Sequence, residues 1–262
     1  MTIKLCGHAH LLYIQRWLKA PTQSVEGDVQ ERIKGTPQGG VISPLLANLF
    51  LHYAIDRWLQ IKFPNLATCR YADDGVIHCH SEAQAKRVIS ELGSRLQECG
   101  LQLHPDKTCI VYCKDGRRKE RYSNTAFNFL GYTFKPRVVC NRKTKHRFVS
   151  FTPAASQEAQ KAMRDRIRRA PWRWRTELSI EDISRQFNAV LRGWLNYYGK
   201  FHRSALNSVW RHFNRTLIKW AMRKFKRYKR SKTRASKSLQ NYAENRPMLF
   251  AHWECGMRCA FA

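Results

Sequence analysis

The sequence predicts an α+β protein with a mixed part over residues 1–150 and an all-helical part over residues 151–262. Three observations lead to this prediction. In the first part, short runs rich in β-branched and aromatic residues alternate with helical patterns and turn signals. In the second part, apolar residues keep helical spacing. The charge also changes along the chain, because no Asp or Glu occurs between residues 183 and 243.

The first part divides into helices, strands and loops in sequence order. A helix is predicted over residues 5–18, a strand in V-Q-E-R-I-K-G, and a Gly/Pro-rich loop from Gly35 to Pro44. An apolar helix follows, with these core candidates: Leu46, Leu49, Tyr53 and Leu59. Ser81 begins S-E-A-Q, a capping-box pattern, and Gly100 stands where a C-terminal cap belongs.

More strands and three helices complete the predicted order. Strands are expected in L-Q-L-H-P-D-K-T-C-I-V-Y-C, in N-F-L-G-Y-T-F, and in R-V-V-C and H-R-F-V-S-F, which the turn N-R-K-T-K joins. Ser156 opens a helix that runs to about Ala170, and Ser179 caps the next one. A third helix is expected from about Ser204 to Tyr228.

The composition restricts the partners more than the fold. The 262 residues include 48 Lys and Arg against 19 Asp and Glu, a net charge of +29. Such a surface attracts polyanions, with nucleic acid as the first candidate and an anionic membrane surface as the alternative. No apolar run reaches the roughly 18 residues of a spanning helix. The interrupted apolar residues near Met1 make a poor secretory signal, so we expect a soluble, cytoplasmic protein.

The cysteines fit the same expectation. Nine scattered Cys residues, an odd number, do not resemble a secreted disulfide framework. Near the end of the chain, His252, Cys255 and Cys259 offer three ligands for a metal, but no second Cys pair is placed to complete a zinc tetrahedron. Buried or incidental thiols therefore explain this cluster better than a metal site does.

Two neighbouring carboxylates, Asp73 and Asp74, lie between two short β-rich runs in R-Y-A-D-D-G-V-I-H. With Gly75 they predict a hairpin, since Asp-Gly favours a type I′ turn. A plain turn is one interpretation of the pair. A metal site is the other, because adjacent carboxylates repel each other unless a cation binds them.

The surrounding motifs favour the metal site. Their order is G-T-P-Q-G-G-V-I-S-P-L-L-A-N, then R-Y-A-D-D, then L-H-P-D-K-T, then F-L-G-Y. This order resembles the palm of reverse transcriptases, most closely those encoded by bacterial group II introns. The later segment L-R-G-W-L-N-Y-Y-G-K-F resembles the maturase, or X, domain of the same proteins. The resemblance covers essentially the whole chain.

The resemblance implies roles for individual residues. Asp73 and Asp74 would bind Mg²⁺ in a two-metal nucleotidyl transfer. Lys107 would face the triphosphate of the incoming dNTP; an ordinary surface lysine is its alternative. The template and the incoming nucleotide would lie beside the loop that contains Pro37, Gln38 and Gly39. The primer grip would consist of a strand that also serves the core: Phe129, Leu130, Gly131 and Tyr132.

A stretch rich in Lys and Arg predicts RNA binding in the helical part. Twelve Lys or Arg lie between Arg211 and Lys237, and a merely solvated helix face would carry acids among them. The candidate contacts are Arg223, Lys224, Lys226, Arg227, Lys229 and Arg230. Among the interleaved aromatics Trp210, Trp220 and Tyr228, most are expected in the core, with one or two left to stack on unpaired bases.

One part of the family pattern is not found in this sequence. The palm of the family carries a further aspartate in a strand like D-I-x-x-F-F-D, and none of the acids before Asp73 stands in such a strand. Asp56 is expected at the surface of a helix. We therefore expect an N-terminally truncated chain that begins inside the palm, without the fingers and first palm motif.

Two functions remain open at this stage. One is RNA-directed DNA polymerisation together with assistance of intron splicing, with the missing part supplied by an N-terminal complementing chain or a homodimer partner. The other is a non-enzymatic splicing cofactor that binds structured group II intron RNA, or an inactive mobile-element remnant. Polymerase activity of this chain alone is doubtful under either reading, and primer-template would be a partner only under the first.

Overall fold

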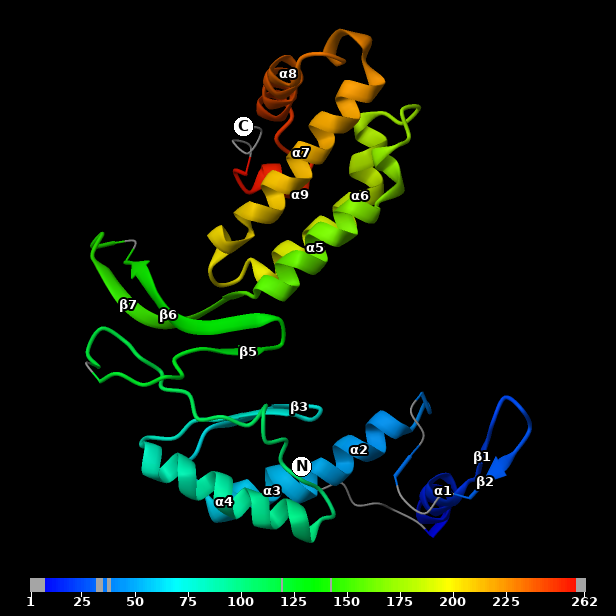
Figure 1. Ribbon diagram of the computed structural model, residues 1–262, viewed down its shortest axis with the longest axis vertical. Helices are drawn as coiled ribbons and strands as arrows, with labels where there is room; N and C mark the ends of the chain where they lie inside the picture. Colours follow the sequence, from blue (N-terminus) through cyan, green and yellow to red (C-terminus); the bar gives the residue numbers. More distant parts are fainter. Residues whose placement is uncertain (1–7, 32–34, 37–38, 119, 142, 258–262) are drawn as a thin grey trace. The chain divides into compact units, whose positions relative to one another are not determined.

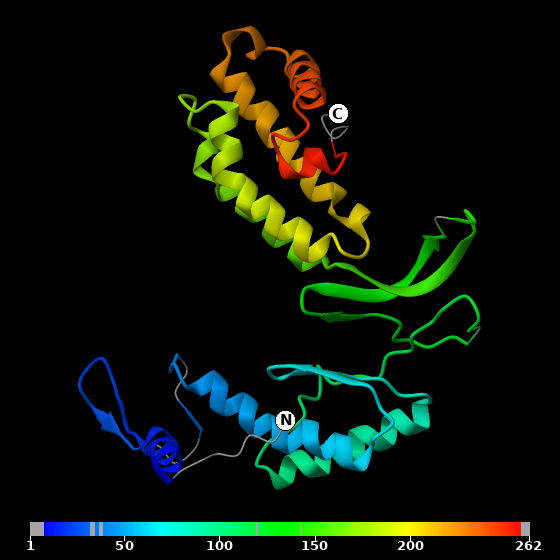
Figure 2. The same ribbon diagram turned by 180° about the vertical axis from the view of Figure 1, so that it is seen from behind.

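A computed structural model describes residues 8–31, 35–36, 39–118, 120–141 and 143–257 of the chain (Figure 1, and from behind in Figure 2). It confirms an α+β protein with small antiparallel sheets. Two compact units form, Met1–Ile110 and Val111–Ala262. This division is structural, and the predicted functional boundary near residue 150 stays a prediction.

The first unit contains helices and two separate two-stranded sheets. Its elements are α1 (His8–Lys19), β1 (Thr22–Gln23), β2 (Val29–Gln30), α2 (Ser43–Leu51), the π-helix η1 (His52–Asp56), α3 (Arg57–Lys62), β3 (Thr68–Tyr71), β4 (Asp74–Ile77) and α4 (Glu82–Glu98). β1 pairs with β2 and β3 with β4, both antiparallel. α1 and the β3–β4 pair confirm the helix and the hairpin predicted there. Of the strand predicted in V-Q-E-R-I-K-G, only Val29 and Gln30 form a strand within the described residues, and α2 begins at Ser43, before the predicted end of the Gly/Pro-rich loop.

The core of the first unit is small. Its buried apolar side chains are Ala54, Leu59, Val88, Leu92 and Leu96. Of the expected core residues, Leu59 is buried, but the prediction for Tyr53 was wrong, since 58% of it is exposed. Tyr53 lies in the π-helix between α2 and α3, where each turn contains one residue more than in an α-helix. The α-helical spacing used for the prediction therefore does not hold there.

Helix α4 begins and ends as its sequence predicts, with one difference. The Ser81 hydroxyl accepts from the Gln84 amide at 3.2 Å. The His80 amide donates to Gln84 Oε1 at 2.8 Å, whereas in a capping box the Ser81 amide would be the donor. At the other end Gly100, at φ 72°, and Leu101 donate to the carbonyls of Gln97 and Leu96, a Schellman arrangement.

The prediction of a strand in residues 101–113 was wrong. This segment is irregular apart from a turn at residues 105–107. Its alternation of apolar residues is typical of a strand, but a strand also needs a neighbour that takes up its backbone hydrogen bonds. Leu103 instead uses its side chain to pack beside Gly93 of α4.

The second unit opens with a three-stranded antiparallel sheet in the order β5-β6-β7. The strands are β5 (Phe127–Phe129), β6 (Tyr132–Cys140) and β7 (Arg147–Ala155). The strands predicted in R-V-V-C and H-R-F-V-S-F are confirmed, but the single strand predicted in N-F-L-G-Y-T-F was wrong, because a tight turn divides it into β5 and the start of β6. Helix α5 (Gln157–Arg169) follows, capped by Ser156, and α6 (Ile180–Tyr198) begins at a full capping box between Ser179 and Asp182.

The remaining helices include two that the sequence did not predict. α7 (Asn207–Lys224) matches the third predicted helix, but α8 (Lys232–Asn245) and the short α9 (Ala251–Glu254) were missed. Three short 3₁₀ turns connect them: η2 (Pro171–Arg173), η3 (Arg203–Leu206) and η4 (Lys226–Tyr228). α8 is strongly polar and buries only a narrow stripe, Ala235, Leu239 and Ala243.

Helix α7 lies at the centre of the second unit. It packs against α5 on one side and α8 on another, and α6 packs against α9 (Figures 1 and 2). Trp210, Phe213 and Trp220 of α7 are at most 1% exposed. Tyr228 is 5% exposed, so the expectation that one or two of these aromatics remain free to stack on bases was wrong.

Candidate functional site

The hairpin that carries the two aspartates turns two residues earlier than the expected Asp74–Gly75 turn. Tyr71 pairs with Asp74 and Arg70 with Gly75, so the two turn residues are Ala72 and Asp73. Ala72 has φ 52°, and no positive φ occurs at Asp73, which is the pattern of a type II′ rather than a type I′ turn. Asp73 therefore lies at the tip, and Asp74 is the first residue of β4.

Both carboxylates are exposed and available to a cation. Within the described residues neither accepts a hydrogen bond or forms an ion pair. Hard oxygen donors of this kind suit Mg²⁺, which commonly uses one or two carboxylates together with substrate phosphates and water. The donor set thus fits Mg²⁺, although the described residues contain no group of three His, Cys, Asp or Glu side chains that could hold a metal ion.

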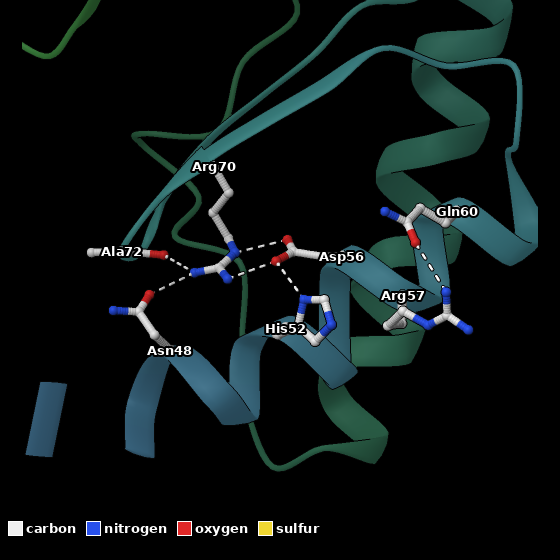
Figure 3. A network of polar contacts seen from close by, with 7 residues as sticks. All are labelled: Asn48, His52, Asp56, Arg57, Gln60, Arg70 and Ala72. Atoms are coloured by element: carbon white, nitrogen blue, oxygen red, sulfur yellow. Dashed lines mark hydrogen bonds and ion pairs between the residues drawn. The ribbon is translucent and has the colours of Figure 1, made fainter. Parts of the chain in front are cut away.

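A polar network fixes the hairpin to the helix before it (Figure 3). Arg70 of β3 donates from Nε and Nη2 to the two oxygens of Asp56, at 2.8 and 2.7 Å. Its Nη1 donates to Asn48 Oδ1 at 3.1 Å and to the Ala72 carbonyl at 2.7 Å. Asp56, which was expected at a helix surface, is in fact only partly exposed and is paired with Arg70, and sequence reasoning did not single out this pair.

The pair shifts the ionisation of both partners. The hydrogen bonds from Arg70 lower the pKa of Asp56 below its usual value, against the opposing effect of burial. The hydrogen bond to Asp56 raises the pKa of Arg70. His52 Nδ1 also lies 3.4 Å from Asp56 Oδ2. Asp56 is consequently held ionised, with its oxygens already occupied by protein donors.

Only some of the other residues predicted around the hairpin belong to the described part of the chain. Pro37 and Gln38 lie outside the described residues, and Gly39 adopts φ 88°, a conformation that favours glycine. Lys107 is exposed in the turn after α4, where its amide donates to the His104 carbonyl at 3.3 Å. No hydrogen bond or ion pair within the described residues links the Lys107 side chain to Asp73 or Asp74.

The predicted primer grip is a tight hairpin in the second unit. Phe129 pairs with Tyr132, so Leu130 and Gly131 form the turn, at φ 49° and 75°. Positive φ at both positions matches a type I′ turn. Leu130 is not a glycine, so its left-handed backbone is strained and needs support from neighbouring groups.

That support comes from the end of α6, within the segment that resembles the maturase domain. Tyr197 Oη donates to the Leu130 carbonyl at 2.9 Å, and the Tyr132 hydroxyl donates to the Tyr197 carbonyl. The rings of Tyr197, Tyr198 and Phe201 all lie around Tyr132. Burial raises the pKa of Tyr132, which keeps its hydroxyl a neutral donor. We call this contact the tyrosine lock.

The tyrosine lock joins two motifs that are far apart in the sequence. A Cβ added at Gly131 would lie 2.7 Å from Tyr198 Oη, so any other residue would have to displace the Tyr198 side chain in addition to adopting a positive φ. Aromatic surface remains open beside this contact, since 46% of Tyr197 and 60% of Phe201 are exposed. The predicted primer grip therefore has both a fixed turn and exposed rings on which a base could stack.

The predicted RNA-binding cations divide into two groups. Lys226, Lys229 and Arg230 are exposed, and their side chains form no hydrogen bond or ion pair within the described part of the chain. Lys224 is used internally, because Nζ donates to the carbonyls of Thr176 and Leu178 at 2.9 and 2.7 Å. Arg223 Nη1 donates to the Arg173 carbonyl at 2.7 Å and its guanidinium lies 4.0 Å from the Trp174 ring centroid. Arg227 stacks on Tyr228 at 4.7 Å.

Sequence reasoning missed a second group of cations. An open pocket of about 710 Å³ between α5 and α6 is lined by Arg166 and Arg169 beside Trp172 and Phe187. These arginines belong to the last turn of α5, where basic residues also favour the helix dipole. A cluster of basic residues at a helix end, R-D-R-I-R-R, was the signal in the sequence that could have identified them.

The C-terminal His and Cys residues do not gather in the described structure. His252 is fully buried, and its Nε2 lies 2.8 Å from Asn214 Oδ1. Cys255 is only partly buried, and Cys259 lies outside the described residues. His252 thus serves the packing between α7 and α9.

Comparisons with known proteins match two regions of the chain to family models. The sequence model of the family described as reverse transcriptase (RNA-dependent DNA polymerase) matches residues 2–134. The model of the group II intron, maturase-specific domain matches residues 160–239. Protein YkfC of Escherichia coli (strain K12) is 32% identical over a region that covers 38% of this chain and 32% of that protein. The chain therefore spans about a third of that relative's length.

The two matched regions contain the two structural features described above. The first includes the aspartate hairpin and the Leu130–Gly131 turn, and the second includes α6, α7 and the exposed cations. No helix among the described residues is long and apolar enough to cross a membrane. The chain belongs to the reverse transcriptase family and carries the maturase-specific domain of group II intron proteins.

Proposed function

We propose that this chain provides the metal-binding palm hairpin and the RNA-binding helices of a group II intron reverse transcriptase and maturase. The observation that supports this most directly is the exposed pair Asp73 and Asp74, presented on a two-residue turn that Arg70 holds. Reverse transcriptases generally use Mg²⁺ for catalysis. When bound, Mg²⁺ would lower the pKa of the attacking hydroxyl and stabilise the charge on the leaving pyrophosphate.

In this proposal different residues of the chain bind the metal, the nucleotide, the primer and the RNA. Asp73 and Asp74 hold the metal, and Lys107 neutralises the triphosphate. The loop at Pro37, Gln38 and Gly39 lies beside the nucleotide and template. Phe129, Leu130, Gly131 and Tyr132 grip the primer, with their turn fixed by the tyrosine lock. RNA phosphates are bound by the exposed cations Lys226, Lys229 and Arg230, with Arg223, Lys224 and Arg227 partly or fully used within the protein.

A second candidate is a splicing cofactor that binds intron RNA without polymerising. It is favoured by one observation, that the described residues bring no third carboxylate to the hairpin. A primer-extension assay with primed RNA, dNTPs and Mg²⁺ separates the two candidates. We expect little or no cDNA from this chain alone. Robust cDNA that is lost in Asp73→Ala would refute the cofactor and establish the polymerase.

RNA binding is tested through its dependence on salt. The variant Lys226→Gln/Lys229→Gln/Arg230→Gln should reduce the slope of log affinity against log salt by about 2, because each lost phosphate contact removes roughly 0.7–0.9. Filter binding to a structured group II intron RNA measures this slope.

A matched control removes the same charge elsewhere. Lys86, Arg87 and Arg95 of α4 each pair with a glutamate, at 2.8, 2.7 and 3.1 Å. Their triple Gln variant should leave the slope nearly unchanged. If both triple variants weaken binding equally, the effect is general charge loss, and the assignment of η4 and the residues after it as the RNA surface fails.

A further inference from the structure

The helix that precedes the aspartate hairpin presents three polar side chains to it. α2, η1 and α3 follow one another without a break from Ser43 to Lys62. Asn48, His52 and Asp56 are spaced four residues apart, so they lie on one side of this helix, and Figure 3 shows them directed toward Arg70. Asp56 closes the π-helical turn. π-helical turns occur often at functional sites, where they reorient side chains.

Arg70 is held more firmly than the other ion pairs of this unit. Its side chain is 14% exposed and that of Asp56 28%, and four hydrogen bonds of 2.7–3.1 Å hold the guanidinium. By comparison, Lys62 pairs with Glu91 through one contact of 2.7 Å, and its side chain is 48% exposed. A bidentate arginine pair of low exposure fixes geometry, whereas an exposed lysine pair contributes little.

The fourth hydrogen bond connects this pair to the turn. Ala72 has φ 52°, a left-handed conformation that L-residues disfavour, and its carbonyl accepts from Arg70 Nη1. The peptide plane that contains this carbonyl also contains the Asp73 amide. Holding the carbonyl therefore sets the direction in which Asp73 leaves the turn. The sheet itself has only two strands, which are marginally stable without external support.

We infer that Arg70 and Asp56 are positioning residues, which hold the Ala72–Asp73 turn and so fix the direction in which Asp73 leaves it, next to Asp74 at the start of β4. The inference deepens the proposed function and rests on it for its metal part. Asp56 is not a metal ligand in this arrangement, because Arg70 and His52 occupy its oxygens. Arg70 is not replaceable by lysine, because one ammonium cannot reach Asp56, Asn48 and Ala72 in the same geometry.

The test measures the hairpin directly, in metal-free full-length protein. Hydrogen exchange of the hairpin amides between Thr68 and Ile77 should become roughly ten- to a hundredfold faster in Arg70→Lys and in Asp56→Asn, since hydrogen bonds to charged groups are among the stronger ones. Amides of β5–β7 should exchange as in the wild type. Glu91→Gln, which breaks the Lys62 pair in the same unit, is the control and should leave the hairpin unchanged.

A second measurement tests the consequence for the metal. Mn²⁺ binding, followed by electron paramagnetic resonance, should be lost in Asp73→Asn/Asp74→Asn and weakened about tenfold in Arg70→Lys at an unchanged thermal midpoint, since residues that orient metal ligands typically change metal affinity by roughly 10–100-fold. Unchanged hairpin exchange in both Arg70→Lys and Asp56→Asn overturns the inference. Wild-type protein that binds no Mn²⁺ at the hairpin would instead refute the proposed metal site, and the exchange data would still decide whether the pair holds the turn.

Discussion

The two hairpins that carry the family motifs are strained in the same way and supported in different ways. Each has a two-residue turn with a side-chain-bearing residue at positive φ, Ala72 at 52° and Leu130 at 49°. At Ala72 the support is an arginine that is itself held by a carboxylate. At Leu130 it is the tyrosine lock. A strained turn can thus be stabilised by charge in a unit with a small core and by packed rings in a unit with a large one.

The largest expected loss of stability comes from adding a side chain at Gly131, which lies against the tyrosine lock. Gly131→Ala should lower the free energy of unfolding of the second unit by about 2–4 kcal/mol, because it adds left-handed strain and an overpacked contact with Tyr198. Denaturant unfolding followed by tryptophan fluorescence measures this change.

Gly193→Ala in α6 is the matched control for that substitution. A Cβ there would meet no atom within 4 Å, and helix interiors favour alanine, so a gain of about 0.5–1 kcal/mol is expected. If the two alanine variants prove equally stable, the turn does not pack tightly against Tyr198. The conclusion that packed rings stabilise the Leu130–Gly131 hairpin would then be wrong.

Acid should distinguish the two units at different pH values. His252 is buried in the second unit, and burial lowers its pKa from 6.5 to about 3. The unfolded chain therefore binds a proton that the folded unit excludes, and stability falls by about 1.4 kcal/mol per pH unit as the pH drops from about 6.5 toward 3. Unfolding midpoints at several pH values measure the slope, and His252→Gln should flatten it.

The first unit responds to acid only at lower pH. The pKa of Asp56 is lowered from 3.8, chiefly by hydrogen bonds from Arg70, so the pair is fully stabilising above that value and is lost as the pH falls below it. The protection factors of the β3–β4 amides, that is, their exchange rates relative to those of an unfolded chain at the same pH, should accordingly stay constant down to about pH 4. Loosening of this hairpin at pH 5–6, together with the second unit, would contradict its support by Asp56.

The smallest expected effect concerns one hydroxyl of the tyrosine lock. Tyr197→Phe removes the 2.9 Å hydrogen bond to the Leu130 carbonyl and keeps the ring contact with Tyr132. The expected loss is about 1 kcal/mol. Thermal unfolding measures it, with Tyr13→Phe on an exposed helix of the first unit as a control that should have no effect on the second unit. A loss above about 3 kcal/mol would mean that the hydroxyl, and not the ring, dominates the contact.

Much of this arrangement was predictable from local sequence. Ser81, Ser156 and Ser179 begin helices because a hydroxyl at that position accepts from an amide two or three residues on, and this depends on neighbours in sequence alone. The aspartate hairpin and the strands of β6 and β7 were predicted for the same reason, whereas the turn at Leu130 and Gly131 was not. The four motifs, taken in order, identified the family.

What escaped prediction depends on contacts between distant segments. Asp56 and Arg70 are fourteen residues apart, and neither a helical nor a strand pattern indicates that they meet. Residues 101–113 have the alternation of a strand but no partner in the described structure. α8 is helical although its apolar stripe consists of two alanines and a leucine, too little for its periodicity to be recognised.

The fit between Gly131 and Tyr198 has a consequence for how such proteins diverge. A side chain at position 131 would displace the hydroxyl of Tyr198, so the two positions are expected to change together among relatives. One lies in the region matched by the polymerase family and the other in the region matched by the maturase-specific domain. A chimera that joins these two regions from different relatives should therefore inherit both positions from one parent.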